Sequence, residues 1–353
     1  MEDLRLLRTD LALDFTPQTV GSDCGVKKVT DARVHVYRKP IELLGGQLLE
    51  EMPRIAGEDS IPPWTVVVGT VSFTEVAGLG NAVDIDEADV LEYLADDDRT
   101  GTVFAYLEDL KHPKRFLDIA SEMTRKKPLI VLKGGATAEG AKAAQSHTAS
   151  LGADDRVLDG AFRQAGIVRI NEFSQLFTVA KAAAFMPPPK GNRVGFVSPS
   201  GAFIVHTRDL CRQRLNLEFP EFQPATLARL KEISPPFIRL SNPVDIFPSA
   251  TVHGMEFAYR ESMEAVLNDP NVDAVVSIMI LTKELGMPSL DFIPELAAKY
   301  PKKPLYISFS GDHACNEEAK AFLEPRGVPT FPLIEDAFKA LDILVRAGQA
   351  LKS

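Results

Sequence analysis

Residues 127–166 read KPLIVLKGGATAEGAKAAQSHTASLGADDRVLDGAFRQAG, and the order of patterns in this stretch is the main indication of the fold. Its first part, 127–133, is an apolar run that predicts a buried parallel strand. Its last part, 155–166, carries apolar residues at helical spacing and predicts an amphipathic helix. The part between them, 134–152, is rich in Gly, Ala, Ser and Thr and predicts a mobile loop, which contains one histidine, His147.

A single imidazole between a strand and a helix has two interpretations. The loop delivers a reactive group, or His147 is a satisfied surface histidine, because histidine has many roles outside catalysis. The loop alone does not decide between them.

Strands and helices alternate at short intervals on both sides of this stretch. The patterns predict strands over 65–73, 102–107 and 167–170 and helices over 86–94, 113–123 and 173–185. Such alternation is typical of a doubly wound parallel α/β sheet. The expected fold is therefore α/β, with parallel sheets of flavodoxin-like plan.

Three consecutive prolines, Pro187–Pro189, interrupt the pattern and predict a boundary, because proline cannot continue a helix. The same alternation then restarts, with strands over 193–197, 274–281, 304–309 and 329–331 and helices over 203–214, 317–323 and 335–351. We therefore expect an irregular N-terminal segment over 1–64, a first flavodoxin-like domain over 65–186 and a second over 190–353.

Composition excludes several classes of protein. The 353 residues are 45% hydrophobic and 25% charged, with a net charge of −10, which argues against a nucleic-acid partner. The three cysteines are widely spaced and form no zinc or disulfide pattern, so we expect no metal site and a cytoplasmic location. No apolar run is long enough to predict a membrane span or a signal peptide.

Four loops follow strands at positions where ligands bind in open α/β sheets. One is the turn at Gly80 and Asn81, and another begins at Glu108. The third contains His147. The fourth is a small-residue turn at the start of a helix, with candidate phosphate-binding residues Ser198, Ser200, Gly201 and Ala202.

Each candidate also has a plainer interpretation. A Gly-Asn pair is often only a turn, the SPSG turn is a weak signal, and Glu108 could be a solvated carboxylate paired with Lys111 or Lys114. Together, however, a histidine, a carboxylate that fixes its tautomer and two turns that favour anions suggest phosphoryl transfer through a phosphohistidine. A phosphorylated side chain carries about two negative charges and needs helix N-termini or cations where it docks.

Several segments resemble the acyl-CoA synthetases that form a nucleoside diphosphate, the superfamily of succinyl-CoA synthetase. The closest resemblance is to the α part of ADP-forming acetyl-CoA synthetase. The matching segments are GLGNAVDIDEADVLEYLADDDRT (78–100), AYLEDL (105–110), the stretch 127–170, PKGNRVGFVSPSGA (189–202) and SNPVDI (241–246). The SHT-containing segment is the most specific of them.

The resemblance implies that His147 is the phosphorylated histidine on a swinging loop and that Glu108 holds it. It implies that the turn 198–202 begins a helix that receives the phosphohistidine. It also implies CoA as a substrate, Mg²⁺ and ADP or ATP held by an ATP-grasp partner subunit, and an oligomeric enzyme.

The chain departs from the family pattern at its N-terminal end. Residues 1–64 are too few for a complete CoA-binding Rossmann domain and contain no Gly-rich dinucleotide turn, and we expect the CoA-binding and ATP-grasp domains to be lacking from this chain. We therefore expect the isolated chain not to bind CoA tightly. Two functions stay open, a subunit or truncated form of an ADP-forming acyl-CoA synthetase and a degenerate, non-catalytic scaffold or regulatory protein.

Overall fold

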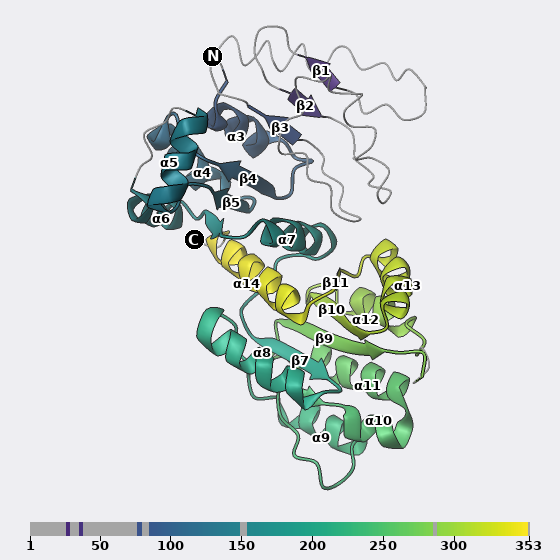
Figure 1. Cartoon of the computed structure of the whole chain (residues 1–353). Helices are drawn as coiled ribbons and strands as arrows, with labels where there is room; N and C mark the ends of the chain where they lie inside the picture. Colours follow the sequence, from purple (N-terminus) through teal and green to yellow (C-terminus); the bar gives the residue numbers. More distant parts are fainter. Residues whose placement is uncertain are drawn as a thin grey trace.

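The computed structural model of the chain describes residues 26–28, 35–37, 76–79, 85–148, 154–284 and 288–351. Figure 1 shows two α/β units that meet at helices α7 (Phe173–Phe185) and α14 (Ile334–Ala350). Near the N-terminus, three short strands pair antiparallel: β1 (Val26–Lys28), β2 (His35–Tyr37) and β3 (Val76–Gly78). None of the helices in these ranges combines the length and apolar character needed to cross a membrane.

The first unit is built on a parallel sheet in the order β4 (Val103–Leu107), β5 (Leu129–Lys133) and β6 (Val168–Ile170). One face packs against α3 (Glu87–Asp96), α4 (Pro113–Met123) and α6 (Asp155–Gln164). The opposite face, with Ile130 and Ile170, packs against α7. Helix α5 (Ala138–Thr148) lies between β5 and α6 in the chain.

The second unit has five parallel strands in the order β11-β10-β9-β7-β8. Numbered within the unit this is the order 2-1-3-4-5, which is that of flavodoxin-like folds. The expected fold class is therefore confirmed. The strands are β7 (Val194–Ser198), β8 (Val244–Asp245), β9 (Ala274–Leu281), β10 (Leu305–Gly311) and β11 (Thr330–Phe331).

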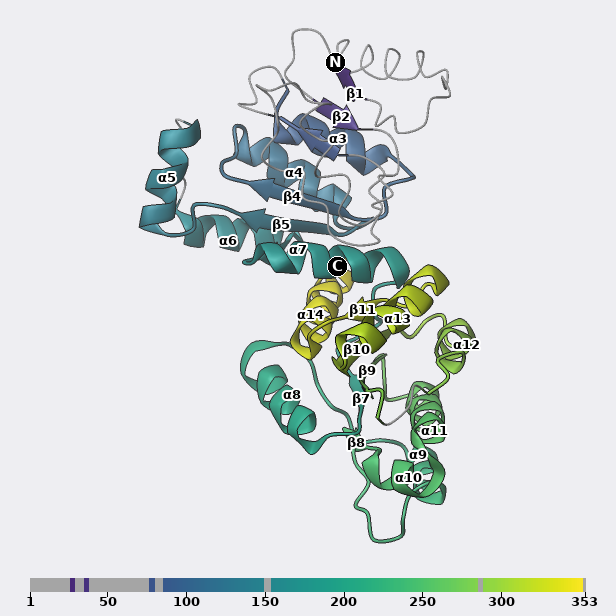
Figure 2. The ribbon, with the colours of Figure 1, turned by 45° about the vertical axis from the view of Figure 1, so that its right-hand side comes forward.

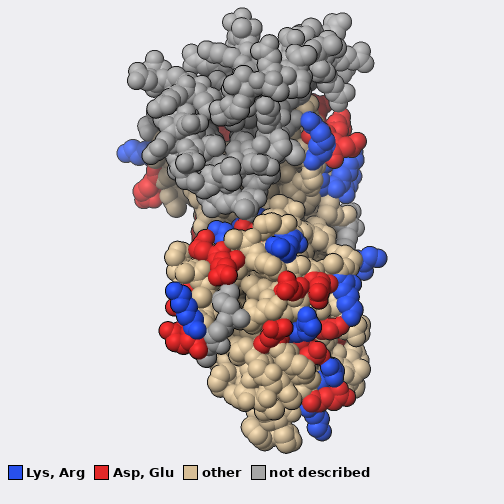
Figure 3. All heavy atoms as spheres, turned by 90° about the vertical axis from the view of Figure 1, so that its right-hand side faces the viewer, with Lys and Arg blue, Asp and Glu red and all other residues tan. Residues whose placement is uncertain are grey.

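Helices cover both faces of the second sheet. Helix α8 (Gly201–Arg214) and α14 pack against one face. The other face is covered by α9 (Pro224–Glu232), α10 (Phe247–His253), α11 (Met255–Asn268), α12 (Phe292–Lys299) and α13 (His313–Leu323), followed by the 3₁₀ turn η1 (Glu324–Arg326). Figure 3, which looks onto the side of α13 in Figure 1, shows acidic and basic side chains intermingled on this surface.

The two units share one local plan at a pair of parallel strands. Residues 126–129 and 302–305 both read KKPL. Val103 pairs with Leu129 across β4 and β5, and Val275 pairs with Leu305 in the same way across β9 and β10. The Val103 amide donates to Pro128 O, and the Val275 amide donates to Pro304 O, both at 2.9 Å.

The lysine before each of these prolines has the same function in both units. Lys127 Nζ donates to carbonyl oxygens at the end of α3, and Lys303 Nζ donates to those at the end of α11, at distances between 2.6 and 3.0 Å. The last carbonyls of a helix have no partner within it, so a buried lysine there satisfies both groups. The units are therefore two copies of one supersecondary plan.

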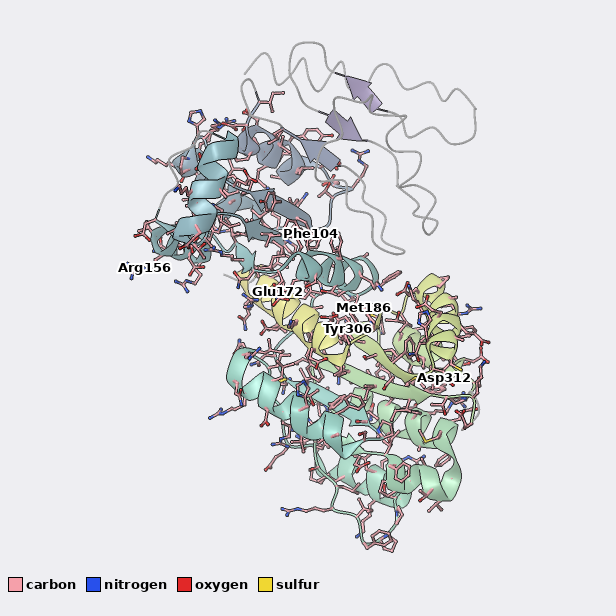
Figure 4. The ribbon with its side chains drawn as sticks, in the orientation of Figure 1. Phe104, Arg156, Glu172, Met186, Tyr306 and Asp312 are labelled. Atoms are coloured by element: carbon pink, nitrogen blue, oxygen red, sulfur yellow. The ribbon has the colours of Figure 1, made fainter. Side chains whose placement is uncertain are left out.

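Helices α7 and α14 follow the last strands of their units and pack against each other. One cluster of buried apolar side chains runs from Ile130 in the first sheet through Val179 and Leu341 to Phe196 in the second sheet. In Figure 4, Glu172 and Met186, which flank α7, lie along this seam, with Tyr306 from the second sheet nearby. The two units therefore share a single core.

A buried ion pair crosses the seam. Lys181 Nζ on α7 lies 2.7 Å from Glu324 Oε1, and the two side chains are 14% and 1% exposed. Lys181 also donates to Thr330 O at 3.0 Å, and Thr330 Oγ1 donates to Glu324 Oε1 at 2.7 Å. Buried charges are tolerated when they are paired and hydrogen-bonded in this way.

We expect Lys181→Met to lower the free energy of unfolding by about 3 to 5 kcal/mol, because it removes the positive charge from beside a buried carboxylate. Urea denaturation measures this value. The matched control is Lys339→Met on α14, whose 3.3 Å pair with the exposed Glu172 crosses the same seam. The control should cost less than about 1 kcal/mol. An equal decrease in the free energy of unfolding in both variants would show that burial of the Lys181–Glu324 pair makes no difference to stability.

Most predicted elements in the described ranges are confirmed within a few residues, but one prediction is wrong. The expected loop over 134–152 contains α5, which covers Ala138–Thr148. Its sequence AEGAKAAQSHT has four alanines with Glu, Lys and Gln, and the summed helix propensity of these residues outweighs the single Gly140. Helices α9 to α12 and strand β8 were not predicted. The strand predicted over 65–73 lies outside the described residues.

Candidate functional site

Parallel strands bring the residues at their carboxyl ends to one edge of the sheet. Lys133 is the last residue of β5 and pairs with Leu107, the last residue of β4. Glu108 therefore follows directly beside Lys133, and Gly134 begins the next turn. Figures 1 and 2 show α5 standing beyond this edge of the first sheet.

Tyr106 fixes the carboxylate of Glu108. The Tyr106 hydroxyl donates to Glu108 Oε1 at 3.1 Å, and the Tyr106 ring stacks on Phe173 with 5.4 Å between centroids. Burial, followed by the charge and hydrogen bond of Glu108, raises the pKa of Tyr106 to about 12. Tyr106 therefore stays protonated at neutral pH and acts as the donor. Glu108 is half-buried rather than fully solvated.

Lys133 joins the two turns at this edge. Its Nζ donates to Glu108 O at 2.7 Å and also to Gly134 O. Burial lowers the pKa of Lys133, an effect opposed by nearby carboxylates. The Gly134 amide donates to Leu107 O at 2.9 Å. The backbone at Glu108 is thus fixed independently of its carboxylate.

Two glycines carry the chain from β5 toward α5 for different reasons. A Cβ on Gly134 would lie 2.8 Å from the Tyr106 hydroxyl and 3.3 Å from Tyr106 Cζ, so a side chain does not fit there. Gly135 has φ of +72°, in the left-handed region that other residues rarely adopt. Gly134 is needed because there is no space for a side chain, and Gly135 is needed because its backbone has a positive φ.

We expect Gly134→Ala to destabilise the fold by about 1 to 3 kcal/mol through overpacking. The loss should be smaller in a Tyr106→Phe background, because the nearest atom is then a ring carbon at 3.3 Å. A double-mutant cycle from thermal unfolding measures the difference. Gly160→Ala on α6 is the control, since nothing lies within 4 Å of its Cβ position. Full additivity of the two substitutions would contradict the contact.

His147 lies in the last turn of α5, and its side chain lies outside the described part of the chain. At the start of the helix, Thr137 Oγ1 accepts from the Gly140 amide at 3.0 Å. On the far side of the segment, Arg169 of β6 holds Asp155, the first residue of α6, through two bonds of 2.8 and 3.1 Å. The segment with His147 therefore begins and ends at fixed points.

Comparison of the two units shows that this segment is an insertion. In the second unit, β10 ends at Gly311 and α13 begins at His313. At the corresponding place in the first unit, residues 134–154 separate β5 from α6. The insertion begins at the edge where Glu108 lies and adds α5, whose last turn contains His147.

The candidate turn after β7 belongs to the other sheet. Ser198 is fully buried, and its hydroxyl donates to Ser200 O at 3.0 Å and accepts from Ser200 N at 3.1 Å, so it shapes the turn. Gly201 and Ala202, in the first turn of α8, are exposed. The candidates Gly80 and Asn81 lie outside the described residues.

The structure therefore groups the predicted residues in two places rather than one. Glu108 and the His147 segment lie at the first sheet, and Ser198 to Ala202 at the second, with α7 and α14 between the sheets (Figures 1 and 2). Within the described ranges, no three His, Cys, Asp or Glu side chains gather as metal ligands would.

Sequence reasoning missed three residues at the first edge, Tyr106, Lys133 and Gly134. One signal was available for Tyr106, because side chains two apart on a strand share a face and Tyr106 precedes Glu108 by two. Nothing in the sequence indicated that Lys133 would bond across to the turn of Glu108.

Residues 66–183 match the family described as the succinyl-CoA ligase like flavodoxin domain. The chain is 34% identical to the ADP-forming acetate–CoA ligase II of Archaeoglobus fulgidus, over 77% of this chain and 40% of that protein. It is 32% identical to the alpha subunit of the ADP-forming acetate–CoA ligase I of Pyrococcus furiosus, over 90% of this chain and 67% of that subunit.

Solved structures agree with these similarities. A dinucleotide forming acetyl-coenzyme A synthetase 1 of Ca. Korarchaeum cryptofilum, in complex with phosphate and ADP, superposes with a TM-score of 0.70 at 26% identity. The match covers 79% of this chain and 60% of that one. The chain thus spans between 40% and 67% of the length of the three relatives compared.

Proposed function

Because this chain belongs to the family of ADP-forming acyl-CoA ligases, we propose that it is the phosphohistidine-carrying part of such an enzyme. The complete reaction interconverts acyl-CoA, phosphate and ADP with a carboxylic acid, CoA and ATP. In this proposal His147 is the nucleophile and carrier, and Glu108 orients it.

The observation that carries the proposal is the fixed carboxylate of Glu108 at the edge from which the His147 segment leaves. A neutral imidazole has one N–H and one nitrogen lone pair. A carboxylate that accepts the N–H fixes the tautomer and stabilises the positive charge that develops as the other nitrogen attacks. Tyr106 and Lys133 hold Glu108 ready for this function.

The proposed transfer balances in two steps. The lone pair of His147 attacks the phosphorus of an acyl phosphate, an N–P bond forms, and the P–O bond to the departing carboxylate breaks. In the second step an oxygen of ADP attacks the same phosphorus, and the N–P bond breaks to restore the imidazole. Both steps are reversible, so ATP can phosphorylate the histidine.

Nucleotide and Mg²⁺ are assigned in this proposal to an ATP-grasp partner subunit. Mg²⁺ is usually bound by one or two carboxylates together with substrate phosphates, so we place it with the nucleotide. Bound there, the ion would neutralise charge on the phosphates during transfer. The Pyrococcus relative is itself named an alpha subunit, which supports a partner of another type.

The first turn of α8 is the proposed second docking place for the phosphorylated side chain. Its exposed Gly201 and Ala202 leave backbone N–H groups accessible at the start of a 14-residue helix. Such an end favours a phosphate. Because this turn lies on the other sheet, it and Glu108 serve different steps of transfer.

A non-catalytic scaffold is the second candidate. The shared core of the two units favours it, because one rigid body could serve association alone. The fixed carboxylate beside the inserted His147 segment favours the ligase. Phosphorylation of His147 separates the two.

We expect His147 to become labelled when the chain is incubated with γ-³²P-ATP, Mg²⁺ and an ATP-grasp subunit of this family. The label should be lost in acid and stable in base, as a phosphoramidate is. His147→Ala should abolish it, whereas His253→Ala, at an exposed histidine in α10, should retain it. Equal labelling of wild type and His147→Ala would refute the assignment and leave the scaffold.

We expect Glu108→Gln to slow this labelling by about 100- to 10,000-fold, because the amide keeps the shape but not the charge that stabilises the imidazolium. Rapid-quench kinetics measures the rate. The matched control is Glu122→Gln, at an exposed glutamate on α4 of the same unit. A Glu108→Gln rate within about twofold of wild type would show that Glu108 has no role in the phosphorylation step.

A further inference from the structure

Tyr106 is enclosed on three sides at the edge of the first sheet. Its hydroxyl donates to Glu108 Oε1 at 3.1 Å. Its ring stacks on Phe173, with an angle of 30° between the planes. Gly134 approaches from the third side, where a single added Cβ would lie 2.8 Å from the hydroxyl. A side chain so enclosed has little freedom to change rotamer.

We propose that Tyr106 is a positioning residue that sets the orientation of the Glu108 carboxylate toward His147. This inference rests on the proposed function, and it names a residue that acts through Glu108 rather than on the phosphate. Gly134 belongs to the same arrangement, because it leaves the space that the Tyr106 hydroxyl occupies.

The hydrogen bond leaves Glu108 able to serve the imidazole. A carboxylate offers about four lone-pair sites on two oxygens, and Tyr106 uses one site on Oε1. Glutamate has several rotatable bonds, and each conformer presents the carboxylate differently. The bond from Tyr106 selects one, so the N–H of His147 meets a carboxylate that is already oriented.

The direction of the hydrogen bond is also determined. Burial and the neighbouring charge of Glu108 keep Tyr106 protonated well above neutral pH, so the hydroxyl donates and the carboxylate accepts. A donor to an ionised group makes a stronger bond than a neutral pair does. The arrangement therefore holds throughout the pH range in which an imidazole works as a nucleophile.

The first arm of the test measures phosphorylation of His147 with γ-³²P-ATP, Mg²⁺ and the ATP-grasp subunit. Tyr106→Phe should lower the rate about 10- to 100-fold, because the carboxylate loses its orientation. In a Glu108→Gln background the same change should cost less than about twofold. Equal costs in both backgrounds, or no cost in the wild-type background, would overturn the inference.

Tyr259→Phe is the matched control. Its buried hydroxyl donates to Ile278 O at 3.2 Å and accepts from the Ile280 amide at 3.1 Å, in the second unit. The Tyr259→Phe variant therefore loses hydrogen bonds of similar length in a part of the molecule that does not contain Glu108. We expect Tyr259→Phe to lower the melting temperature without a change in labelling rate. An equal loss of rate in both variants would reduce Tyr106 to a structural residue.

The second arm does not depend on activity. Tyrosines labelled with ¹³C at Cζ are titrated by NMR in the isolated chain, and Tyr106→Phe assigns the signal. The pKa of Tyr106 should lie near 12 in the wild type and be lower in Glu108→Gln, although burial, the largest cause of the shift, keeps it raised. An unchanged value would show that the pair does not exist and would overturn the inference.

The two arms separate two kinds of failure. If wild-type His147 is not labelled while Tyr106 titrates as expected, the proposed function fails and the step to His147 fails with it, although the Tyr106–Glu108 pair stands. If His147 is labelled and Tyr106→Phe has no effect on the rate, the function stands and the inference is wrong.

Discussion

The packing of α7 against α14 is the contact on which the rest of the molecule depends. Each helix follows the last strand of its unit, so each covers its own sheet on one side and meets the other helix on the opposite side. Apolar burial is the dominant favourable term in folding, and here one cluster is common to both sheets. The buried pair Lys181–Glu324 ties α7 to the second unit, because separation of the two charges would leave each buried without its partner.

The shared plan of the two units explains where function is added. In both units the sequence KKPL leads into a strand, β5 in the first and β10 in the second, and these strands pair with β4 and β9 in the same register. In both, a lysine of this sequence also donates to carbonyl oxygens at the end of a helix, α3 or α11. They differ after that strand, where the first unit inserts 134–154. A loop at the carboxyl edge of a sheet can be lengthened without a change in the core, because the scaffold does not depend on it.

The sequence was sufficient for elements with a clear apolar pattern or start signal. Examples are β9, which is apolar except for Ser277, and α4, which begins at a proline. It was insufficient for α5, because the glycines and serines of the longer stretch 134–152 favour a loop while the alanines within Ala138–Thr148 favour a helix. Glu108 was identified by its place after a strand. Tyr106 and Lys133 were not, because their hydrogen bonds depend on strand register and on a turn distant in the chain.

The same comparison explains why Glu108 and the turn 198–202 were expected together. Both follow strands, and strand ends converge only within one sheet. Here the shared core places two sheets in one body, so residues with the same local pattern lie at different edges. In the proposed function, a phosphoryl group accepted beside Glu108 and delivered near α8 would therefore cross between the sheets. A histidine on an inserted segment, rather than in the core, would make this crossing without disturbing the packed scaffold.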